Sequence, residues 1–199
     1  MALFLPTYFS PIAQYQAIVN ADEVLFEVHD NYQKQTYRNR CYIYGPNGKQ
    51  LLNIPIKHKT ITSKKKTKDT LVDNSSSWQK HHLKSIQIAY RSSPFFEFYE
   101  DDLLSIFTKK YTYLLDVNID TYHFVTDTLQ ISNTYNKTTA YQEDTSTKDY
   151  KYLANAKQQL IQKSNPYIQV FDDKFGFIPN LSILDLLFME GPNAISFLE

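Results

Sequence analysis

Glycine is scarce in this chain of 199 residues, with only four, at positions 45, 48, 176 and 191. Glycine-rich turns such as G-x-G-x-x-G and G-x-x-x-x-G-K allow backbone N–H groups to approach a phosphate closely. Neither pattern can be written with glycines at these positions. The sequence therefore excludes both common mononucleotide-binding loops, and we expect no nucleotide-phosphate loop of this kind.

Cysteine occurs once, as Cys41, which excludes an intramolecular disulfide and any C-x-x-C metal or redox site. The five histidines, at positions 29, 58, 81, 82 and 123, form no H-E-x-x-H or similar ligand spacing. We therefore expect no metal, and the identity of any cofactor stays open.

The chain also lacks net charge and long apolar runs. Twenty-one Lys plus Arg balance 21 Asp plus Glu, so the formal net charge is zero. Tight non-specific binding to nucleic acid needs a broad positive field, so we expect no DNA partner. The apolar runs are far shorter than the about 20 residues of a membrane span, and Pro6 interrupts the one nearest the N-terminus. We expect a mature cytoplasmic protein.

Arginine is rare beside lysine, with Arg38, Arg40 and Arg91 against 18 lysines. A composition rich in Lys, Asn, Ile and Tyr is typical of AT-rich genomes, so the 16 tyrosines do not by themselves indicate a sugar-binding surface. The three arginines are more informative, because only Arg offers a planar fork for carboxylate or phosphate. We interpret them as candidate anion ligands, with chance retention as the alternative.

Short apolar strands alternate loosely with amphipathic helices, which predicts a mixed α/β (α+β) fold. We expect strands at 2–5, 23–28 and 167–171, and a hairpin of 38–44 and 49–56 around Asn47-Gly48. Helices are expected at 10–20, 78–91, within 95–113, at 116–129 and at 182–189, with another after Gly191-Pro192. The predicted arrangement is a single domain, 1–199, whose central sheet contains the hairpin and is flanked by helices.

Two polar stretches, 57–76 and 132–149, are expected to be solvent loops, the second with short strands in it. The first carries six lysines between 57 and 68, for which phosphate steering is the alternative interpretation. Ser10 is expected to cap the first helix, because Pro11 follows it at the first helical position. Asn180 or Ser182 is expected to cap the helix that ends near Met189.

The hairpin determines how Cys41 is interpreted. A two-residue turn at Asn47-Gly48 pairs Cys41 with Ile54, whereas a four-residue loop pairs Cys41 with Leu52. Because side chains alternate along a strand, both registers place Cys41, Ile43, Leu52 and Ile54 on one face and Arg38, Arg40 and Tyr42 on the other. We therefore interpret Cys41 as a buried structural residue; a Cys41–His82 nucleophile pair is the alternative.

Residues 27–40 form the densest polar stretch next to predicted strands. The stretch is either a solvated loop or the rim of a pocket that offers guanidinium for anions and amides for sugar hydroxyls. Asp30, which follows His29, is the candidate for proton transfer there. On the helix predicted at 78–91, His82 lies on the inward side, either as a satisfied core residue or as a catalytic base.

Several segments resemble the WbqC-like family, in the branch common in Bacteroidetes. They are Leu5-Pro6-Thr7-Tyr8-Phe9-Ser10-Pro11, Tyr37-Arg38-Asn39-Arg40, Trp78-Gln79-Lys80-His81-His82, Ala89-Tyr90-Arg91 with Pro94-Phe95-Phe96, and the stretch from Phe177 to Pro192. The motif positions that the resemblance carries over to this chain are Asn39, Arg40, Trp78, His82, Tyr90, Pro94, Asn180, Ser182 and Asp185. His81 and Leu83 depart from the family's usual residues, and Phe4-Leu5-Pro6 replaces the His-Gln-Pro of other branches.

The resemblance implies a transferase of surface-polysaccharide (O-antigen) biosynthesis that moves a glycyl or other acyl group to an amino sugar. Its expected partners are a nucleotide- or lipid-linked amino sugar and an activated acyl donor. His82 and Asp30 are the candidate catalytic residues, and Asn39, Arg40, Arg38, Arg91, Tyr90 and Asn180 the candidate substrate-binding residues. The alternative is a non-catalytic sugar-phosphate-binding or scaffold protein of the same pathway.

Overall fold

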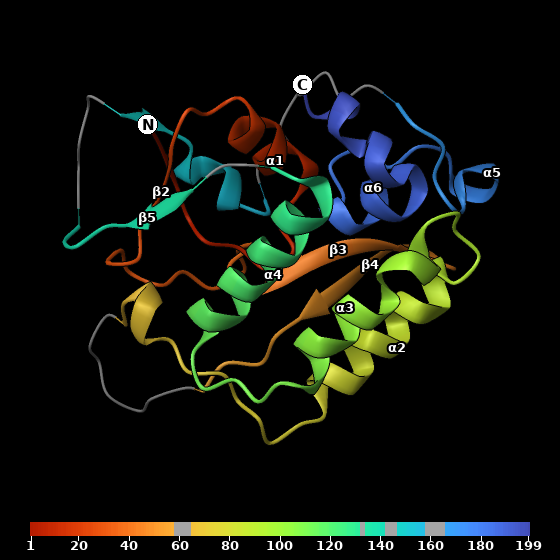
Figure 1. The fold of residues 1–199 in the computed structure, drawn as a ribbon. Coiled ribbons are helices and arrows are strands. Elements are labelled where there is room, and N and C mark those ends of the chain that lie inside the picture. Colours follow the sequence, from red (N-terminus) through yellow and green to blue (C-terminus); the bar gives the residue numbers. More distant parts are fainter. Residues whose placement is uncertain (58–64, 132–133, 142–146, 158–165) are drawn as a thin grey trace.

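The computed structural model describes residues 1–57, 65–131, 134–141, 147–157 and 166–199 (Figure 1). The helices are α1 (Ile12–Val19), α2 (Trp78–Tyr90), α3 (Phe96–Thr108), α4 (Leu114–Leu129), α5 (Asp172–Phe175) and α6 (Ile183–Glu190). The strands are β1 (Ala2–Phe4), β2 (Val24–Phe26), β3 (Arg40–Gly45), β4 (Gly48–Asn53), β5 (Tyr135–Lys137) and β6 (Lys148–Asp149). Three 3-10 helices complete the described elements: η1 (Thr67–Asp69), η2 (Lys151–Ala154) and η3 (Gly191–Phe197).

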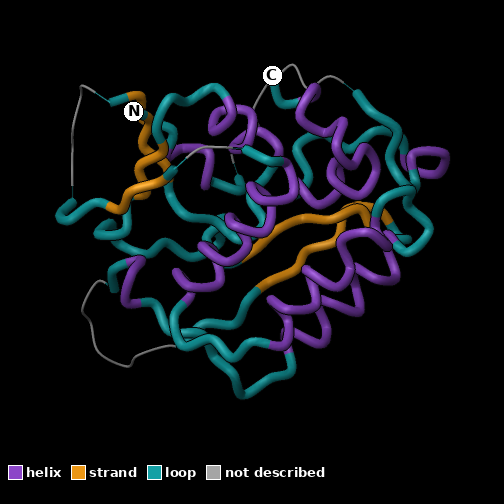
Figure 2. Tube along the Cα trace, in the orientation of Figure 1, coloured by secondary structure: helices purple, strands orange, loops and turns teal. Residues whose placement is uncertain are grey.

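The strands form two separate sheets. Four short parallel strands are ordered β5-β2-β1-β6, whereas β3 and β4 form a two-stranded antiparallel sheet of their own. Figure 2 shows this hairpin running through the middle of the molecule, with the parallel strands grouped near the N-terminus. The mixed α/β fold in a single domain is confirmed, but the hairpin does not join the parallel sheet. The chain leaves the carboxyl end of β2 directly into residues 27–39.

The hairpin has the register predicted for a four-residue loop, but the ladder continues to Gly45 and Gly48, so the turn has two residues rather than four and is not at Asn47-Gly48. Cys41 pairs with Leu52, and Gly45 pairs with Gly48 across the two-residue turn Pro46-Asn47. Gly48 has a φ of +94°, a conformation that glycine adopts without the steric cost of a Cβ. Cys41, Ile43, Leu52 and Ile54 are all buried, as the alternation predicts.

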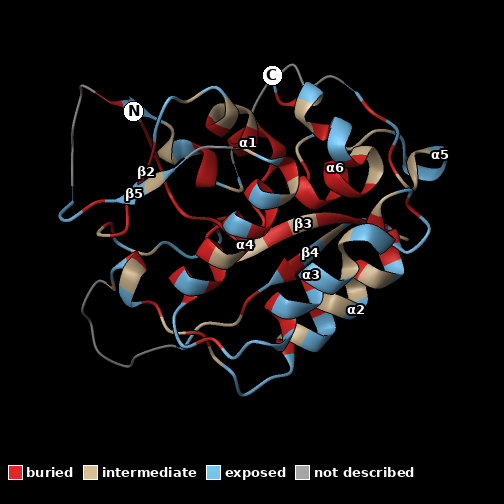
Figure 3. Ribbon diagram, viewed as in Figure 1, coloured by how far each residue is buried: buried red, intermediate tan, exposed pale blue. Residues whose placement is uncertain are grey.

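Buried residues are concentrated in β3, α4 and α6, whereas β4 alternates between buried and exposed residues (Figure 3). Helices α2 and α6 both pack against β3. Tyr90 of α2 is fully buried, and its hydroxyl accepts a hydrogen bond of 2.9 Å from the backbone N–H of Tyr44 in β3. No helix in the described ranges is long and apolar enough to cross a membrane.

Two local expectations are wrong. Ser10 does not cap α1; instead the side-chain Oδ1 of Asn180 accepts from the N–H of Ala13, 3.0 Å away. Residues 167–171 form no strand. On α3, Phe98 is 75% exposed.

The described part of 57–76 is more ordered than a solvated loop. Its backbone bonds to neighbouring segments on both sides, and Thr67, Thr70 and Val72 are buried. The stretch 132–149 contributes β5 and β6 to the parallel sheet. Residues 58–64, which carry Lys59 and Lys64, and residues 132–133 and 142–146 lie outside the described residues.

Candidate functional site

Four segments that are distant in sequence lie side by side next to the hairpin. The η1 segment bonds to the segment after β2, through Tyr32 N–H to Lys65 O at 2.7 Å and Thr67 N–H to Asp30 O at 2.9 Å. The residues that follow η1 bond to the segment after β4 and to the start of α4, through Lys57 N–H to Leu71 O at 3.0 Å and Leu114 N–H to Thr70 O at 2.8 Å. These bonds satisfy backbone groups and hold the walls of a cavity in place.

This cavity, the Arg40 cavity, has a volume of about 1100 Å³. Its lining is strongly basic for a chain of zero net charge. Five cationic side chains face two carboxylates: Lys34, Arg40, Lys57, Lys65 and Lys66 against Asp69 and Asp73. Tyr32 and Tyr113 add aromatic rings to the lining. The arrangement favours an anionic ligand.

Two of the predicted substrate-binding residues, Asn39 and Arg40, line this cavity. The amide nitrogen of Asn39 donates to Asn53 Oδ1 at 3.1 Å and to Ile54 O at 3.0 Å, while its Oδ1 is buried without a partner. Arg40 begins β3, and its guanidinium makes no hydrogen bond or ion pair with any described residue. Its Nε is buried and unpartnered. Arg40 therefore carries an uncommitted positive charge at the cavity wall.

Asp30 and Arg38 lie behind this wall as a buried ion pair rather than in its lining. Arg38 is 2% exposed and also donates to Thr36 Oγ1 at 3.2 Å. The expectation that Arg38 lies on the outer hairpin face is wrong, because β3 begins at Arg40 and the strand alternation does not extend to Arg38. Asp30 Oδ1 and Arg38 Nε remain without partners.

Tyr32 keeps its hydroxyl proton at neutral pH. Burial raises the pKa of Tyr32 to about 12, against the opposing effect of the nearby Arg38 and Arg40 charges. The hydroxyl can therefore donate a hydrogen bond to a ligand oxygen. The sequence placed Tyr32 in a polar stretch next to predicted strands but gave no reason to expect Tyr113 beside it.

His82 is buried outside the cavity lining. Its Nδ1 forms a hydrogen bond of 2.9 Å with the hydroxyl of Tyr8, and its ring packs edge-on against Trp78. Burial lowers the pKa of His82 to about 4, with a smaller raising effect from a hydrogen bond to the backbone of Asn53. At neutral pH His82 is therefore an uncharged ring within the core.

The remaining predicted binding residues do not line the cavity. Tyr90 is fully buried, and its hydroxyl donates to Asp185 Oδ1 at 2.7 Å. Asn180 caps α1 through Ala13. The Arg91 side chain is 72% exposed and lies 3.7 Å from Glu100. The structure thus brings Asn39 and Arg40 together in one cavity and places Tyr90, Asn180 and Arg91 elsewhere.

Cys41 is a free, buried thiol. Burial raises the pKa of Cys41 far above its usual range, so the thiolate needed for nucleophilic attack is not formed at neutral pH. Among the described residues, no group of three or more His, Cys, Asp and Glu side chains is arranged to hold a metal ion.

The sequence gave no local signal for Asn53, Asp69, Asp73 and Tyr113, which also line the cavity. Each lies in a different neighbourhood of the chain from residues 27–40. The hairpin ladder and the Asn39 side chain hold Asn53 in place, and backbone bonds among the four segments bring the other three to the cavity.

Searches of curated proteins and of solved structures found no match to this chain. The WbqC-like protein family matches residues 6–165, a range that includes Asn39, Arg40 and His82. The C-terminal segment from Phe177 to Pro192, which also resembles that family, lies beyond the matched residues. Because the match covers well over half of the sequence, the chain belongs to the WbqC-like protein family.

Proposed function

We propose that this protein transfers a glycyl or other acyl group to the amine of an amino sugar in surface-polysaccharide biosynthesis, and that the Arg40 cavity binds the phosphate of the nucleotide- or lipid-linked acceptor. The supporting observation is the unpartnered Arg40 guanidinium in a cavity where cations outnumber carboxylates. A guanidinium forms paired, charge-assisted hydrogen bonds with phosphate oxygens. The type of reaction and the pathway in this proposal rest on the resemblance to the WbqC-like family.

The proposed reaction forms an amide. The lone pair of the neutral sugar amine attacks the carbonyl carbon of an activated donor such as a thioester, and a C–N bond forms. The C–S bond breaks, the thiolate leaves, and the nitrogen loses its extra proton to a base. A pre-activated donor is favoured over free glycine, because the chain has neither of the common glycine-rich phosphate loops that would mark an ATP site.

The base is better assigned to the cavity than to His82. A proton acceptor has to reach the amine, and His82 neither lines the cavity nor has a free Nδ1. Asp69 and Asp73 are the two carboxylates in the lining. We therefore assign the proton transfer to one of these two, with Arg40 and Asn39 holding the acceptor.

A binding protein without catalysis is the second candidate. It is favoured by the absence of any imidazole or thiol from the described lining of the Arg40 cavity. In that case the cavity holds the sugar phosphate and no product forms.

The first experiment measures phosphate recognition by calorimetry, with UDP-linked amino sugars and the corresponding sugar 1-phosphates as probes. Arg40→Ala should weaken binding by about tenfold or more, which corresponds to about 1.4 kcal/mol. Arg40→Lys should recover only part of the loss, because an ammonium lacks the planar fork. Arg91→Ala is the matched control and should bind like wild type. Equal binding by Arg40→Ala and wild type would refute the proposed phosphate site.

The second experiment separates transfer from binding alone. Wild type, Asp69→Asn and Asp73→Asn are incubated with a bound amino-sugar probe and acyl thioesters or glycyl-tRNA, and the products are followed by mass spectrometry. An amide product that is lost in one Asn variant, with probe affinity unchanged, supports the transferase. Tight binding without product from any donor supports the binding protein.

A further inference from the structure

The lining of the Arg40 cavity holds both a hydrogen-bond donor and a hydrogen-bond acceptor that are buried without partners. The donor is Arg40 Nε and the acceptor is Asn39 Oδ1. Asn39 is only 7% exposed, and its amide nitrogen donates to Ile54 O, which fixes the orientation of the amide. An ionised phosphate only accepts hydrogen bonds, so it can satisfy Arg40 but not Asn39. A ligand that satisfies both side chains carries a donor as well as a phosphate.

One carboxylate of the lining, Asp73, is held beside Asn39. The N–H of Ile54 donates to Asn39 O at 2.8 Å, and the N–H of Asp73 donates to the carbonyl of the next residue, Pro55, at 2.8 Å. Asp73 Oδ1 also accepts from the N–H of Ser75 at 3.0 Å. A carboxylate has about four acceptor positions, so this bond leaves capacity for a ligand. Asn39 and Asp73 therefore offer acceptors in one part of the cavity.

The other carboxylate of the lining, Asp69, is too far along the chain to join them. Asp69, Leu71 and Asp73 line the cavity, whereas the two residues between them are buried, which is the alternation of an extended chain. Four residues of extended chain span about 13 Å. A single donor group therefore cannot contact both carboxylates, and only Asp73 shares its position with Asn39.

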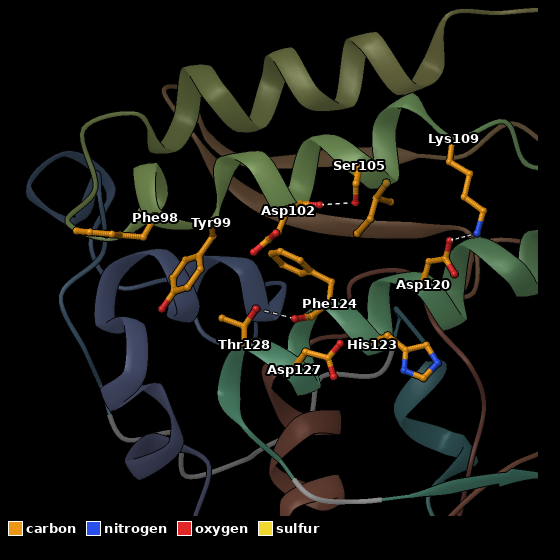
Figure 4. A pocket seen from close by; sticks show the side chains of 11 residues that line it. Phe98, Tyr99, Asp102, Ser105, Lys109, Asp120, His123, Phe124, Asp127 and Thr128 are labelled. Atoms are coloured by element: carbon orange, nitrogen blue, oxygen red, sulfur yellow. Dashed lines mark hydrogen bonds and ion pairs between the residues drawn. The ribbon is translucent and has the colours of Figure 1, made fainter.

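The cations of the lining do not close on these carboxylates. Within the described ranges, Lys34, Arg40 and Lys66 form no ion pair. Elsewhere in the fold, Lys109 bonds directly to Asp120 at 2.6 Å (Figure 4). The cations would repel an amine that entered the cavity alone, whereas a phosphate on the same molecule would neutralise them. The separated charges fit a ligand that carries both a phosphate and a protonated amine.

The spacing of the two subsites fits a single sugar. Arg40 pairs with Asn53 across the hairpin, and Pro55, which holds Asp73, follows two residues later. Two residues of extended chain span about 7 Å. A hexose that carries a phosphate on one carbon and an amine on another can bridge this separation.

From this complementarity, we infer that the Arg40 cavity recognises a free, protonated amine on the sugar that carries the phosphate, and that Asn39 Oδ1 and the Asp73 carboxylate accept its N–H groups. This inference rests on the proposed function and deepens it. It requires an acceptor whose amine is not acylated, and it selects Asp73 over Asp69 as the carboxylate at the amine. The reaction that supplies the acceptor must therefore leave a free amine, as transamination or deacetylation does.

The test compares ligands that differ at one carbon. Hexoses with a free amine, a hydroxyl or an acetamide at the same carbon, each as the 1-phosphate and as the UDP-linked form, are titrated calorimetrically at pH 7. We expect at least one free-amine form to bind about tenfold more tightly than both of its counterparts. The same amino sugar without phosphate should bind at least about tenfold more weakly than its 1-phosphate.

Three variants locate the amine. Asp73→Asn should remove the preference for the amine and bind the hydroxyl form at least as tightly as wild type does, because Asn keeps an acceptor for Ser75 N–H. Asp69→Asn should keep the preference. The matched control is Asp127→Asn, which changes a carboxylate in a separate cavity between α3 and α4 (Figure 4) and should also keep it.

The outcomes distinguish the amine subsite from the phosphate site. Equal affinities for the three forms, all weakened by Arg40→Ala, would overturn the amine inference and leave the proposed phosphate site standing. A preference that survives in Asp73→Asn, or that disappears in Asp69→Asn or Asp127→Asn, would also overturn it, because the amine would not be recognised at Asp73. If no member of the panel binds, the proposed phosphate site fails together with the inference.

Discussion

Two buried polar clusters in this fold differ in how completely their hydrogen bonds are formed. The Asp185 cluster consists of Asp185, Tyr90, Tyr167 and Gln169. Its carboxylate accepts from Tyr90 at 2.7 Å on Oδ1, and from Tyr167 at 2.5 Å and Gln169 at 2.8 Å on Oδ2. Gln169 Oε1 in turn accepts from the N–H of Ile178. Every carboxylate oxygen of this cluster is used within the protein.

The second cluster, the Arg38 cluster, is incompletely satisfied. It consists of Asp30, Arg38, Thr67 and Asn118, which hydrogen bonds join, and of Asn39 and Arg40, which follow Arg38 in the chain. Among the described residues, eight buried side-chain polar atoms lack a partner, and six of them belong to this cluster. Buried polar groups are normally paired, so unpaired atoms gathered beside one cavity mark a place where water or ligand completes the bonding. The complete cluster holds the fold together, and the incomplete one adjoins the candidate site.

The largest predicted effect on stability comes from removing Asp185, the residue at the centre of the fully bonded cluster. Asp185→Ala leaves the buried hydroxyls of Tyr90 and Tyr167 without their acceptor, and we expect a loss of about 3–5 kcal/mol in the free energy of unfolding. Urea denaturation measures this loss. Asp173→Ala removes an exposed carboxylate a short way along the chain and should change stability by less than about 0.5 kcal/mol. A loss below about 1 kcal/mol in Asp185→Ala would contradict the structural role of the Asp185 cluster.

The next largest predicted effect is the dependence of folding stability on pH that the buried His82 causes. Its pKa is about 4 when folded, against an ordinary value of 6.5, because burial disfavours the imidazolium. Below pH 6.5 the unfolded chain therefore binds a proton that the folded chain does not. His82 therefore contributes to the free energy of unfolding above pH 6.5. This contribution, about 3 kcal/mol in total, is lost as the pH falls towards 4.

Denaturation between pH 7 and 4 tests this titration. His82→Gln should show a smaller fall in stability across that range than wild type, whereas His123→Gln, which alters an exposed ring, should show the wild-type fall. Identical falls for wild type and His82→Gln would mean that His82 does not titrate as its burial indicates. A base with this pKa is also a weak proton acceptor at neutral pH, consistent with a place in the core.

The parts of the fold that local patterns control were predictable. The apolar periodicity located α2 and α4 to within a few residues, and the Asn-Gly signal located the hairpin. Ser182 caps α6 as expected, with its hydroxyl accepting from Leu184 N–H. The cap of α1 was missed because Asn180, which supplies it, lies more than 160 residues away in sequence.

The candidate site was also predictable only in part, because residues that are distant in sequence meet there. Asn39 and Arg40 follow from the scarcity of arginine and from the family motif, and both line the cavity. Asp69, Asp73 and Tyr113 reach it through backbone bonds between segments that carry no sequence mark of their pairing. Tyr90 belongs to the same family motifs but is fully buried and bonded to Asp185, so a motif identifies structural as well as binding residues.

The smallest predicted effect compares two buried threonine hydroxyls at the Arg38 cluster, one with hydrogen-bond partners and one without. Thr67 and Thr121 are both buried, but Thr67 Oγ1 has no partner, whereas Thr121 Oγ1 donates to Asn118 O at 2.9 Å and accepts from Phe9 N–H at 3.4 Å. Valine has nearly the shape of threonine, so the substitution removes the hydroxyl and little else. We expect Thr121→Val to lose about 1–2 kcal/mol and Thr67→Val to change by less than about 0.5 kcal/mol. Equal losses, measured by urea denaturation, would show that an ordered water already satisfies Thr67 and that the Arg38 cluster is complete without a ligand.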